Sequence, residues 1–239
     1  MKHLAVSALL TLSLGLTSLS GQTAAPQPGD QPEGAPAEAP QQTYGSVAGD
    51  LYTSPTGVFQ IRIPVLPQLG GTITDTPNVV TFEDDFTTHM SVGAFPLSRE
   101  LKWEYDTRGT RDFLIYFFTS IVMPDFVSRF PGAHMEDNGI YLPKYQDGSM
   151  LIFTLLPGGS YFTPRITLFN TAPSVVAKRG NICFVKYNHV FVVSIELAER
   201  VLEHSTYHQT AEHENEILRK RLLDAVGRMQ FIKPPEVKD

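Results

Sequence analysis

The densest group of residues that could hold a metal ion lies between residues 204 and 214. It contains His204, Tyr207, His208, Glu212, His213 and Glu214. If a helix began early, His204 and His208 would be i,i+4 neighbours on one face, and imidazole and carboxylate groups are common zinc ligands. The zincin pattern is absent, because no second histidine follows His213 at the required spacing. The sequence leaves two readings: a metal site formed by His204, His208, Glu212 and His213, or a solvated approach to a helix.

Other catalytic patterns are missing. There is no Gly-x-Ser-x-Gly elbow, and Ser149 and Ser160 follow glycines in segments typical of turns. The single cysteine, Cys183, lies in an apolar run where a buried, unreactive thiol is expected. The paired Asp84 and Asp85 could form a corner of a calcium site, or simply a turn. We predict no catalytic residue and no cofactor.

Two aromatic residues stand outside any strong pattern. Trp103 and Tyr105 lie among the charged residues Arg99, Lys102 and Asp106. Exposed aromatic side chains are favoured at interfaces, so the pair is a candidate binding surface. The alternative is that both side chains cover an edge of the sheet.

Strand patterns dominate the elements that must position these residues. Residues 59–63 alternate so that Phe59, Ile61 and Ile63 should face inward. Residues 78–83 and 89–95 form the next pair, with Asp84 and Asp85 in the turn. Asp147-Gly148 predicts a hairpin between residues 140–145 and 150–155. A second hairpin is expected at residues 182–187 and 190–197, with Asn188-His189 at its tip. Residues 165–169 and 230–232 are further predicted strands.

Two helices are predicted. Apolar residues at helical spacing between Thr107 and Phe130 indicate a heavily buried helix, which Pro124 should kink or end. A strand over residues 113–119 remains an alternative. Residues 210–229 form the clearer helix, with Thr210 as N-cap and a stripe of apolar side chains. That stripe consists of Leu218, Leu222, Val226 and Met229. We therefore predict an α+β fold: an antiparallel sheet of six to eight strands flanked by two main helices.

The first 48 residues have a different composition. Lys2 and His3 precede an uncharged apolar run that ends near Ser18 and Ser20, which predicts a signal peptide over residues 1–20. An uncleaved anchor is the alternative, but the run is shorter than the roughly 20 apolar residues of a spanning helix. Residues 21–48 are rich in Pro, Gln and Ala and predict a disordered linker. Residues 49–233 have the length of one globular domain, and residues 234–239 form a tail.

The overall charge excludes some classes of partner. The chain carries a formal charge of −6, so it lacks the basic surface that nucleic acids or anionic lipids require. One cysteine cannot form an internal disulfide, so the apolar core must stabilise the domain alone. After signal cleavage, we expect no stable insertion in the membrane. These features predict a soluble exported protein, in the periplasm or outside the cell.

The start of the domain resembles that of PsbP-like domains. The resemblance rests on Tyr52, Ser54-Pro55, Gly57, Phe59, Ile61 and Ile63-Pro64, and on a later hairpin, C-terminal helix and final aromatic residue, Phe231. These are turn and core positions, so the resemblance implies a fold, an antiparallel sheet flanked by helices. It also implies binding or assembly roles rather than one reaction. The resemblance does not identify any functional residue of the family in this sequence.

Three functions follow as hypotheses. The first is an exported, non-enzymatic binding or assembly module whose partner is a protein or small molecule of the cell envelope. The second is a metal-binding protein or hydrolase that uses His204, His208 and His213. The third is a structural component of the envelope with the Trp103 region as its contact surface.

Overall fold

The computed structural model describes residues 43–162, 176–202 and 206–234. The predicted signal peptide, most of the predicted linker, the strand expected at residues 165–169 and His204 lie outside these residues. The described ranges cover most of the domain predicted over residues 49–233.

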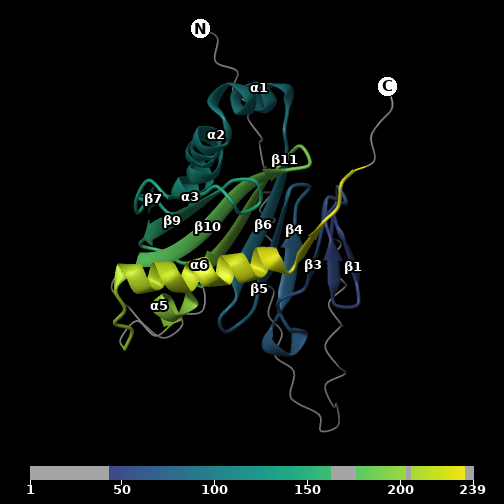
Figure 1. Ribbon diagram of the computed structural model, residues 1–239. Coiled ribbons are helices and arrows are strands. Elements are labelled where there is room, and N and C mark those ends of the chain that lie inside the picture. The colour runs from purple at the N-terminus through teal and green to yellow at the C-terminus, as the bar shows by residue number, and fades with distance from the viewer. Residues whose placement is uncertain (1–42, 163–175, 203–205, 235–239) are drawn as a thin grey trace, which may run out of the picture. The chain divides into compact units, whose positions relative to one another are not determined.

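Consecutive hairpins build an antiparallel sheet of eight strands (Figure 1). In order across the sheet, seven of them are β4 (Thr72–Asp75), β5 (Val79–Glu83), β6 (His89–Pro96), β11 (His189–Glu196), β10 (Val176–Lys186), β9 (Ser149–Pro157) and β7 (His134–Met135). The eighth, β8 (Ile140–Leu142), also pairs with β9. This confirms the predicted α+β fold and the predicted size of its sheet.

The turns use residues that tolerate positive φ. Asp147 and Gly148 have φ of 60° and 115° before β9, as the sequence predicts. At the tip between β10 and β11 the two positive-φ residues are Tyr187 and Asn188, at 48° and 57°. The predicted tip, Asn188-His189, was wrong by one residue because His189 already pairs with Lys186 in the ladder.

A smaller antiparallel sheet, absent from the prediction, packs beside the large one. Its strands are β1 (Ser46–Ala48), β2 (Leu51–Thr53), β3 (Phe59–Arg62) and β12 (Met229–Phe231). Phe59 and Ile61 are buried, as their alternation predicts. The strand expected near residues 230–232 is β12, which brings the end of the chain back to β3.

A helical layer follows β6. It comprises α1 (Arg99–Arg108), α2 (Thr110–Phe117), the π-helical turn η2 (Phe118–Val122) and α3 (Met123–Arg129). A 3₁₀ turn, η1 (Pro67–Leu69), precedes β4. The predicted helix over residues 107–130 is largely confirmed, but α1 was missed. Ser98 caps α1 by accepting a hydrogen bond from the Leu101 N–H, and Gly109 separates it from α2.

Pro124 does not end the helical segment. It stands in the first turn of α3, directly after the π-helical turn. Proline in a regular helix interior clashes with the preceding turn and removes a hydrogen bond, whereas a wider π turn relieves that conflict. Of the two predicted effects, a kink or an end, the end was wrong: helical structure continues past Pro124, and the departure from regular α-helix is the π-helical turn before it.

The C-terminal helix agrees closely with its prediction. α6 spans Ala211–Gly227, and the side chain of Thr210 accepts a hydrogen bond from the backbone N–H of His213. Leu218, Leu222 and Val226 are buried along one stripe, but Met229, the fourth predicted member, lies beyond the helix in β12. A short helix, α5 (Ala198–Leu202), follows β11.

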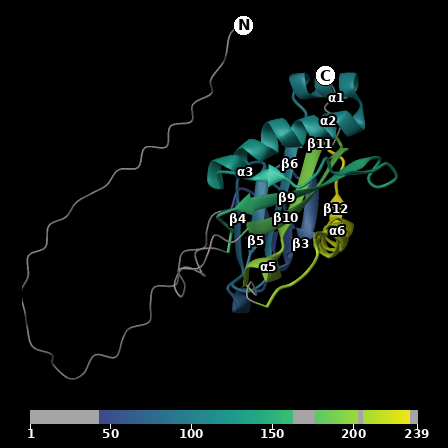
Figure 2. The ribbon, with the colours of Figure 1, turned by 90° about the vertical axis from the view of Figure 1, so that its left-hand side faces the viewer.

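The two faces of the large sheet carry separate cores. α6 and the α1–α3 layer lie on opposite faces of the sheet (Figure 2). On the α6 face, Phe82, Phe184 and Phe191 pack with the small sheet. On the other face, Phe113 and Phe117 of α2 cover Met150 and Cys183. Toward β4 this second face becomes polar.

Candidate functional site

A row of polar side chains crosses the large sheet on the face that the α2–α3 layer covers. Directly paired positions in successive strands are Thr74, Thr81, Ser91, Ser194 and Asn181. Because side chains alternate along strands, all five belong to one face. Ser194 and Asn181 are buried and hydrogen-bonded to each other at 2.7 Å. The hydroxyl row is therefore inside the domain at β10 and opens outward toward β4.

A second polar row lies two residues further along the same strands. It consists of Glu83, His89, Glu196, Arg179 and Thr154. Except for Glu83, these side chains are buried. Buried charged residues are rare unless they are paired and hydrogen-bonded. Their presence on one face marks this part of the sheet as more than a packing surface.

Arg179 is the centre of this row. Its guanidinium donates to Nδ1 of His89 at 2.8 Å and to Oγ of Ser91 at 3.3 Å, and it lies 3.6 Å from a carboxylate oxygen of Glu196. Arginine has no acceptor, so Nδ1 of His89 must be the unprotonated ring nitrogen. Nε2 then carries the proton and lies 3.7 Å from Glu83. Burial lowers the pKa of Arg179 and Glu196 opposes that shift, yet the group stays charged at neutral pH.

Glu196 is held from its other side by the turn after β9. Ser160 Oγ donates to one carboxylate oxygen, and the Tyr161 N–H donates to the other at 3.2 Å. Burial raises the pKa of Glu196, and Arg179 with these two donors opposes the shift. The carboxylate therefore has donors around it that replace water.

Aromatic rings cover the arginine. The Tyr161 ring lies 4.7 Å from the Arg179 guanidinium and 4.3 Å from the His89 ring. Phe126 of α3 lies 5.8 Å from the same guanidinium. Burial raises the pKa of Tyr161, so its phenol stays protonated and adds no charge to the site. The cation therefore lies within cation–π distance of two aromatic rings.

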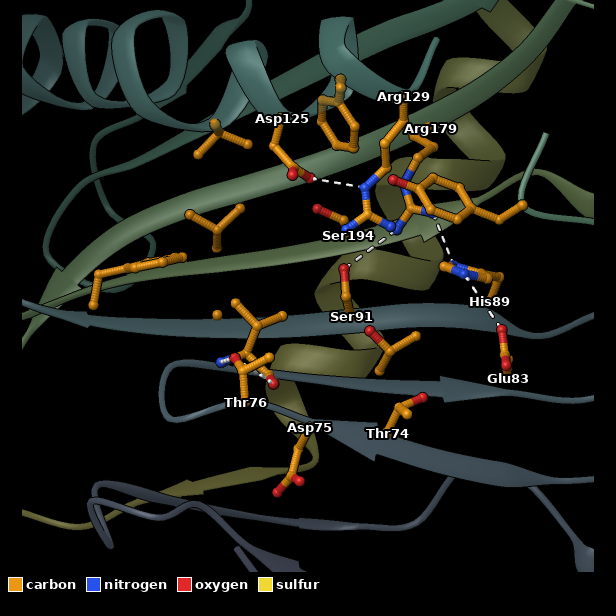
Figure 3. A pocket seen from close by; sticks show the side chains of 18 of the residues that line it. Thr74, Asp75, Thr76, Glu83, His89, Ser91, Asp125, Arg129, Arg179 and Ser194 are labelled. Atoms are coloured by element: carbon orange, nitrogen blue, oxygen red, sulfur yellow. Dashed lines mark hydrogen bonds and ion pairs between the residues drawn. The ribbon is translucent and has the colours of Figure 1, made fainter. Parts of the chain in front are cut away.

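A pocket of about 660 Å³ opens between these polar rows and the helical layer (Figure 3). Arg129 of α3 and Arg179 of β10 enter it above the hydroxyl of Ser91, while Asp75 points away. Arg129 pairs with Asp125 at 3.5 Å, and both side chains are more than half exposed. Phe95, Ile121, Val122 and Phe126 supply an apolar wall. The volume is in the range of small-molecule sites.

The histidine cluster predicted as a metal site is described only in part. His204 lies outside the described residues. His208, Glu212 and His213 are exposed at the start of α6, and His213 lies 3.9 Å from Glu216. In the part of the chain that the structure describes, no three His, Cys, Asp or Glu side chains are grouped so as to hold a metal ion. The metal site stays a prediction.

The candidate surface at Trp103 and Tyr105 belongs to α1. Trp103 is 63% exposed, whereas Tyr105 is half-buried, with its ring edge-to-face against Phe113 at 5.2 Å. Residues two apart on a helix do not face the same side. The two aromatics therefore do not form one surface, and neither lines the pocket. A contact role for Trp103 stays a prediction.

The remaining candidates have structural roles. Cys183 is buried in β10, and burial raises the pKa of its thiol, so the reactive thiolate is disfavoured. Asp84 accepts backbone hydrogen bonds from Phe86, Thr87 and Thr88, at 2.8–2.9 Å. Of the two roles considered for Asp84, a calcium-site corner or a turn, these hydrogen bonds correspond to the turn.

Sequence reasoning missed the pocket residues. Arg179 and Asn181 precede the predicted strand at residues 182–187, because β10 begins earlier, at Val176. Ser194 and Glu196 fall inside a predicted strand, but the pattern does not tell whether their face meets water or a helical layer. The available signal was a set of polar residues at two-residue spacing within strands that otherwise look like core: His89 and Ser91, Arg179 and Asn181, Ser194 and Glu196.

Within residues 43–162, 176–202 and 206–234, every helix is too short or too polar to span a lipid bilayer.

Comparisons with known proteins return structural neighbours alone. No protein-family model matches the chain, and no curated protein matches it. The Ran-binding protein Mog1p of Saccharomyces cerevisiae has a TM-score of 0.45 at 8% identity, over 79% of this chain and 97% of its own. A cyanobacterial PsbP from Synechocystis also has a TM-score of 0.45, at 11% identity, over 79% of this chain and 98% of its own. The structures that this chain resembles thus include a PsbP, the family that its sequence pattern resembles.

Proposed function

We propose that this chain is a non-enzymatic binding module that takes a small polar molecule into the pocket between the large sheet and α3. The observation that carries this proposal is the buried arginine at the floor of the pocket. Arg179 is 1% exposed and is fixed by Glu196, His89, Ser91 and two aromatic rings.

Burying an ion pair such as Arg179–Glu196 costs free energy of desolvation. Moving a charged pair out of water costs several kcal/mol per ion before the pair and its hydrogen bonds offset it. A hydrophobic pair of similar size would serve packing alone as well or better. Buried ionisable groups that line a cavity and have shifted pKa values therefore indicate a ligand-binding site.

The arrangement favours binding over catalysis. The hydroxyl of Ser160 is directed at Glu196, and Nδ1 of His89 accepts from Arg179. Ser160 does not line the pocket, and the lone pair of His89 Nδ1 is occupied, so neither residue is placed as a nucleophile or general base toward a substrate there. The pocket offers donors, rings and a fixed shape.

The proposed place of action is outside the cytoplasm. The support is the signal-peptide pattern of residues 1–20 and the Pro-rich stretch after it. The ligand would then be a small molecule of the cell envelope. Fractionation of cells that express the full chain tests this part, and recovery in the cytoplasm alone would contradict it.

A ligand screen tests the pocket. Compounds of varied charge and size are added to the full chain, and thermal unfolding is followed. A ligand at one hundred times its Kd adds about 2.7 kcal/mol of stability, which raises Tm by several degrees. Bound compounds are then recovered and identified by mass spectrometry, and we expect them unchanged.

Two substitutions place any binding in the pocket. Thr81→Trp fills the pocket from β5, whereas Thr107→Trp adds the same side chain at an exposed position of α1 outside it. We expect the first to abolish the Tm shift and the second to retain it. Thr74→Trp repeats the test from the exposed edge strand β4. Equal effects of the pocket and control variants, no binding by any compound, or recovery of a converted compound would each overturn the proposal.

A further inference from the structure

We infer that the ligand of this pocket is a small monocarboxylate: one carboxylate group on an apolar body. The inference rests on the proposed function and adds the chemical class that the pocket selects. It is drawn from which polar groups in the pocket already have partners and which do not.

In the described part of the pocket, the groups left without a protein partner can all donate hydrogen bonds, and the two threonine hydroxyls among them can also accept. The Nε of Arg179 is buried and has no hydrogen-bond partner among the residues that the structure describes. Arg129 has one ion pair, between its Nε and Asp125, and its two terminal nitrogens contact no acceptor among the described residues. The hydroxyls of Thr74 and Thr81 likewise have no protein partner within the described ranges. A buried donor left unpaired costs about 1–3 kcal/mol, so a ligand that brings acceptors is favoured.

The acceptors, in contrast, are already engaged. Asp75 accepts from Tyr44 N–H, Gly45 N–H and the Tyr52 hydroxyl, at 2.7–2.8 Å. Glu83 faces His89 and the Thr72 hydroxyl. A ligand that offers mainly donors would therefore compete with contacts that the protein already makes.

Arg129 is the group that can bind a charge. Its pair with Asp125 has a 3.5 Å separation, and the two side chains are 58% and 61% exposed. Exposed pairs contribute only about 0–1 kcal/mol, so exchanging Asp125 for a ligand costs little. A guanidinium matches the two oxygens of a carboxylate in a bidentate arrangement.

The charges around the pocket disfavour a ligand with more than one negative charge. Glu196 compensates Arg179, so Arg179 supplies a donor rather than surplus charge. Asp125 and Glu83 also line the pocket and would repel a second negative charge. A phosphate monoester, which is close to a dianion at neutral pH, fits this balance poorly.

The rest of the ligand must suit an apolar wall. Ile121 and Val122 of the π-helical turn and Phe126 of α3 line the helical side of the pocket, and Phe95 lies on the sheet side, in the same strand as Ser91. Phe126 is 6% exposed, so its ring is a firm part of the wall. A compact aliphatic or aromatic group would bury itself against these side chains.

The experiment compares compounds that share one body. Phenylacetate, phenylacetamide, phenethylamine and phenyl phosphate are titrated into the full chain by calorimetry, and hexanoate with its amide repeats the comparison for an aliphatic body. We expect each acid to bind about tenfold more tightly than its amide, and the amine and the phosphate to bind more weakly than the acid.

Substitution of Arg129 assigns the preference. Arg129→Gln should weaken the acid about tenfold and leave the amide unchanged, whereas Arg129→Lys should recover part of the loss. Arg111→Gln, at an exposed arginine of α2 outside the pocket, is the matched control and should change neither.

The outcomes separate the two proposals. If the amide or amine binds as tightly as the acid, or if Arg129→Gln weakens acid and amide alike, the carboxylate assignment is wrong while pocket binding stands. If phenyl phosphate binds tightest, the single-charge argument fails. If no compound of any class binds in a way that Thr81→Trp abolishes, the binding function itself is wrong.

Discussion

The ion pair of Arg179 and Glu196 matters both for the stability of the domain and for its pocket. Both side chains are almost fully buried, and they lie on adjacent central strands at directly paired positions. Removing one partner of such a pair leaves the other as an uncompensated buried charge. Removing both leaves only a change of packing, which is often neutral.

Glu196→Gln therefore destabilises the domain by about 3–5 kcal/mol at neutral pH. The amide oxygen can still accept from Ser160, so the loss reports the missing charge opposite Arg179 together with the hydrogen bond from the Tyr161 N–H. The free energy of unfolding in urea measures it.

Asp106→Asn, which breaks the exposed Lys102–Asp106 pair, is the control and should change stability by less than about 1 kcal/mol. The double variant Arg179→Met, Glu196→Leu should recover most of the stability. Equal costs for Glu196→Gln and Asp106→Asn would contradict this account.

The sequence could not reveal this pair at the residue scale. Arg179 meets His89 across 90 positions of sequence, and only the strand register brings them together. A polar residue at alternate positions of a strand normally indicates a solvated face. Here the α2–α3 layer covers that face, so the same pattern indicates a pocket. Cys183, by contrast, was placed correctly because its apolar neighbours alone determine its burial.

At the scale of elements, the sequence was most informative where local signals were strong. The Asp147-Gly148 turn and the Thr210 cap of α6 depend on neighbouring residues alone, and both are confirmed. Helix α1 was missed because it has no buried residue and hence no apolar stripe. The small sheet was missed because its strands are only three or four residues long and come from both ends of the domain.

The close approach of α6 to β10 depends on a glycine. A Cβ on Gly180 would lie 2.9 Å from a methyl of Leu222 and 3.0 Å from Cβ of Leu218. Leu222 can turn its methyl away, but the Leu218 Cβ moves only with the helix. Gly180→Ala should therefore push α6 from the sheet and cost about 1–3 kcal/mol in the free energy of unfolding.

Gly227, the last residue of α6, is the matched control for that substitution. A Cβ on Gly227 would meet no other part of the domain within 4 Å, and its φ is not positive. Gly227→Ala should be neutral or stabilising by up to about 1 kcal/mol, because alanine favours helix. Urea unfolding of both variants measures the difference. A Gly180→Ala variant as stable as Gly227→Ala would show that α6 does not sit as close to β10 as described.

On the scale of the whole domain, the large sheet has two chemically different faces. One face is mostly apolar and packs on α6 and the small sheet, with one buried ion pair between Lys178 of β10 and Glu214 of α6. The other is apolar only toward β9 and carries the polar rows toward β4. The helical layer covers both parts of that second face, so the pocket forms where polar strands and apolar helices meet. The sequence predicts the sheet and its helices, but which helix covers which face follows from long-range packing.

The acid sensitivity of the domain is expected to arise from two carboxylates whose pKa values the fold lowers, Asp84 in a turn and Glu199 in α5. Burial alone would raise the pKa of Asp84, but the backbone N–H groups of Thr88, Phe86 and Thr87 hold it below its ordinary range. Burial alone would also raise the pKa of Glu199, but two hydrogen bonds from Arg221 of α6, at 2.5 and 3.1 Å, lower it below its ordinary value. A depressed pKa in the folded state stabilises the domain at pH values above the unfolded pKa, about 4. That contribution is lost as pH falls through the folded pKa.

Asp84→Asn should therefore be less stable than the parent protein at neutral pH, by about 1–2 kcal/mol, because a neutral amide accepts the three backbone hydrogen bonds less strongly. Below about pH 4 the parent loses its advantage as Asp84 becomes protonated, so the two stability curves should converge. Urea unfolding at a series of pH values measures both curves, and the Glu199→Gln curve should converge in the same window. Asp106→Asn removes an exposed carboxylate and should run parallel to the parent. A gap between Asp84→Asn and the parent that stays constant down to acid pH would mean that the turn depends on the shape of Asp84 and not on its charge.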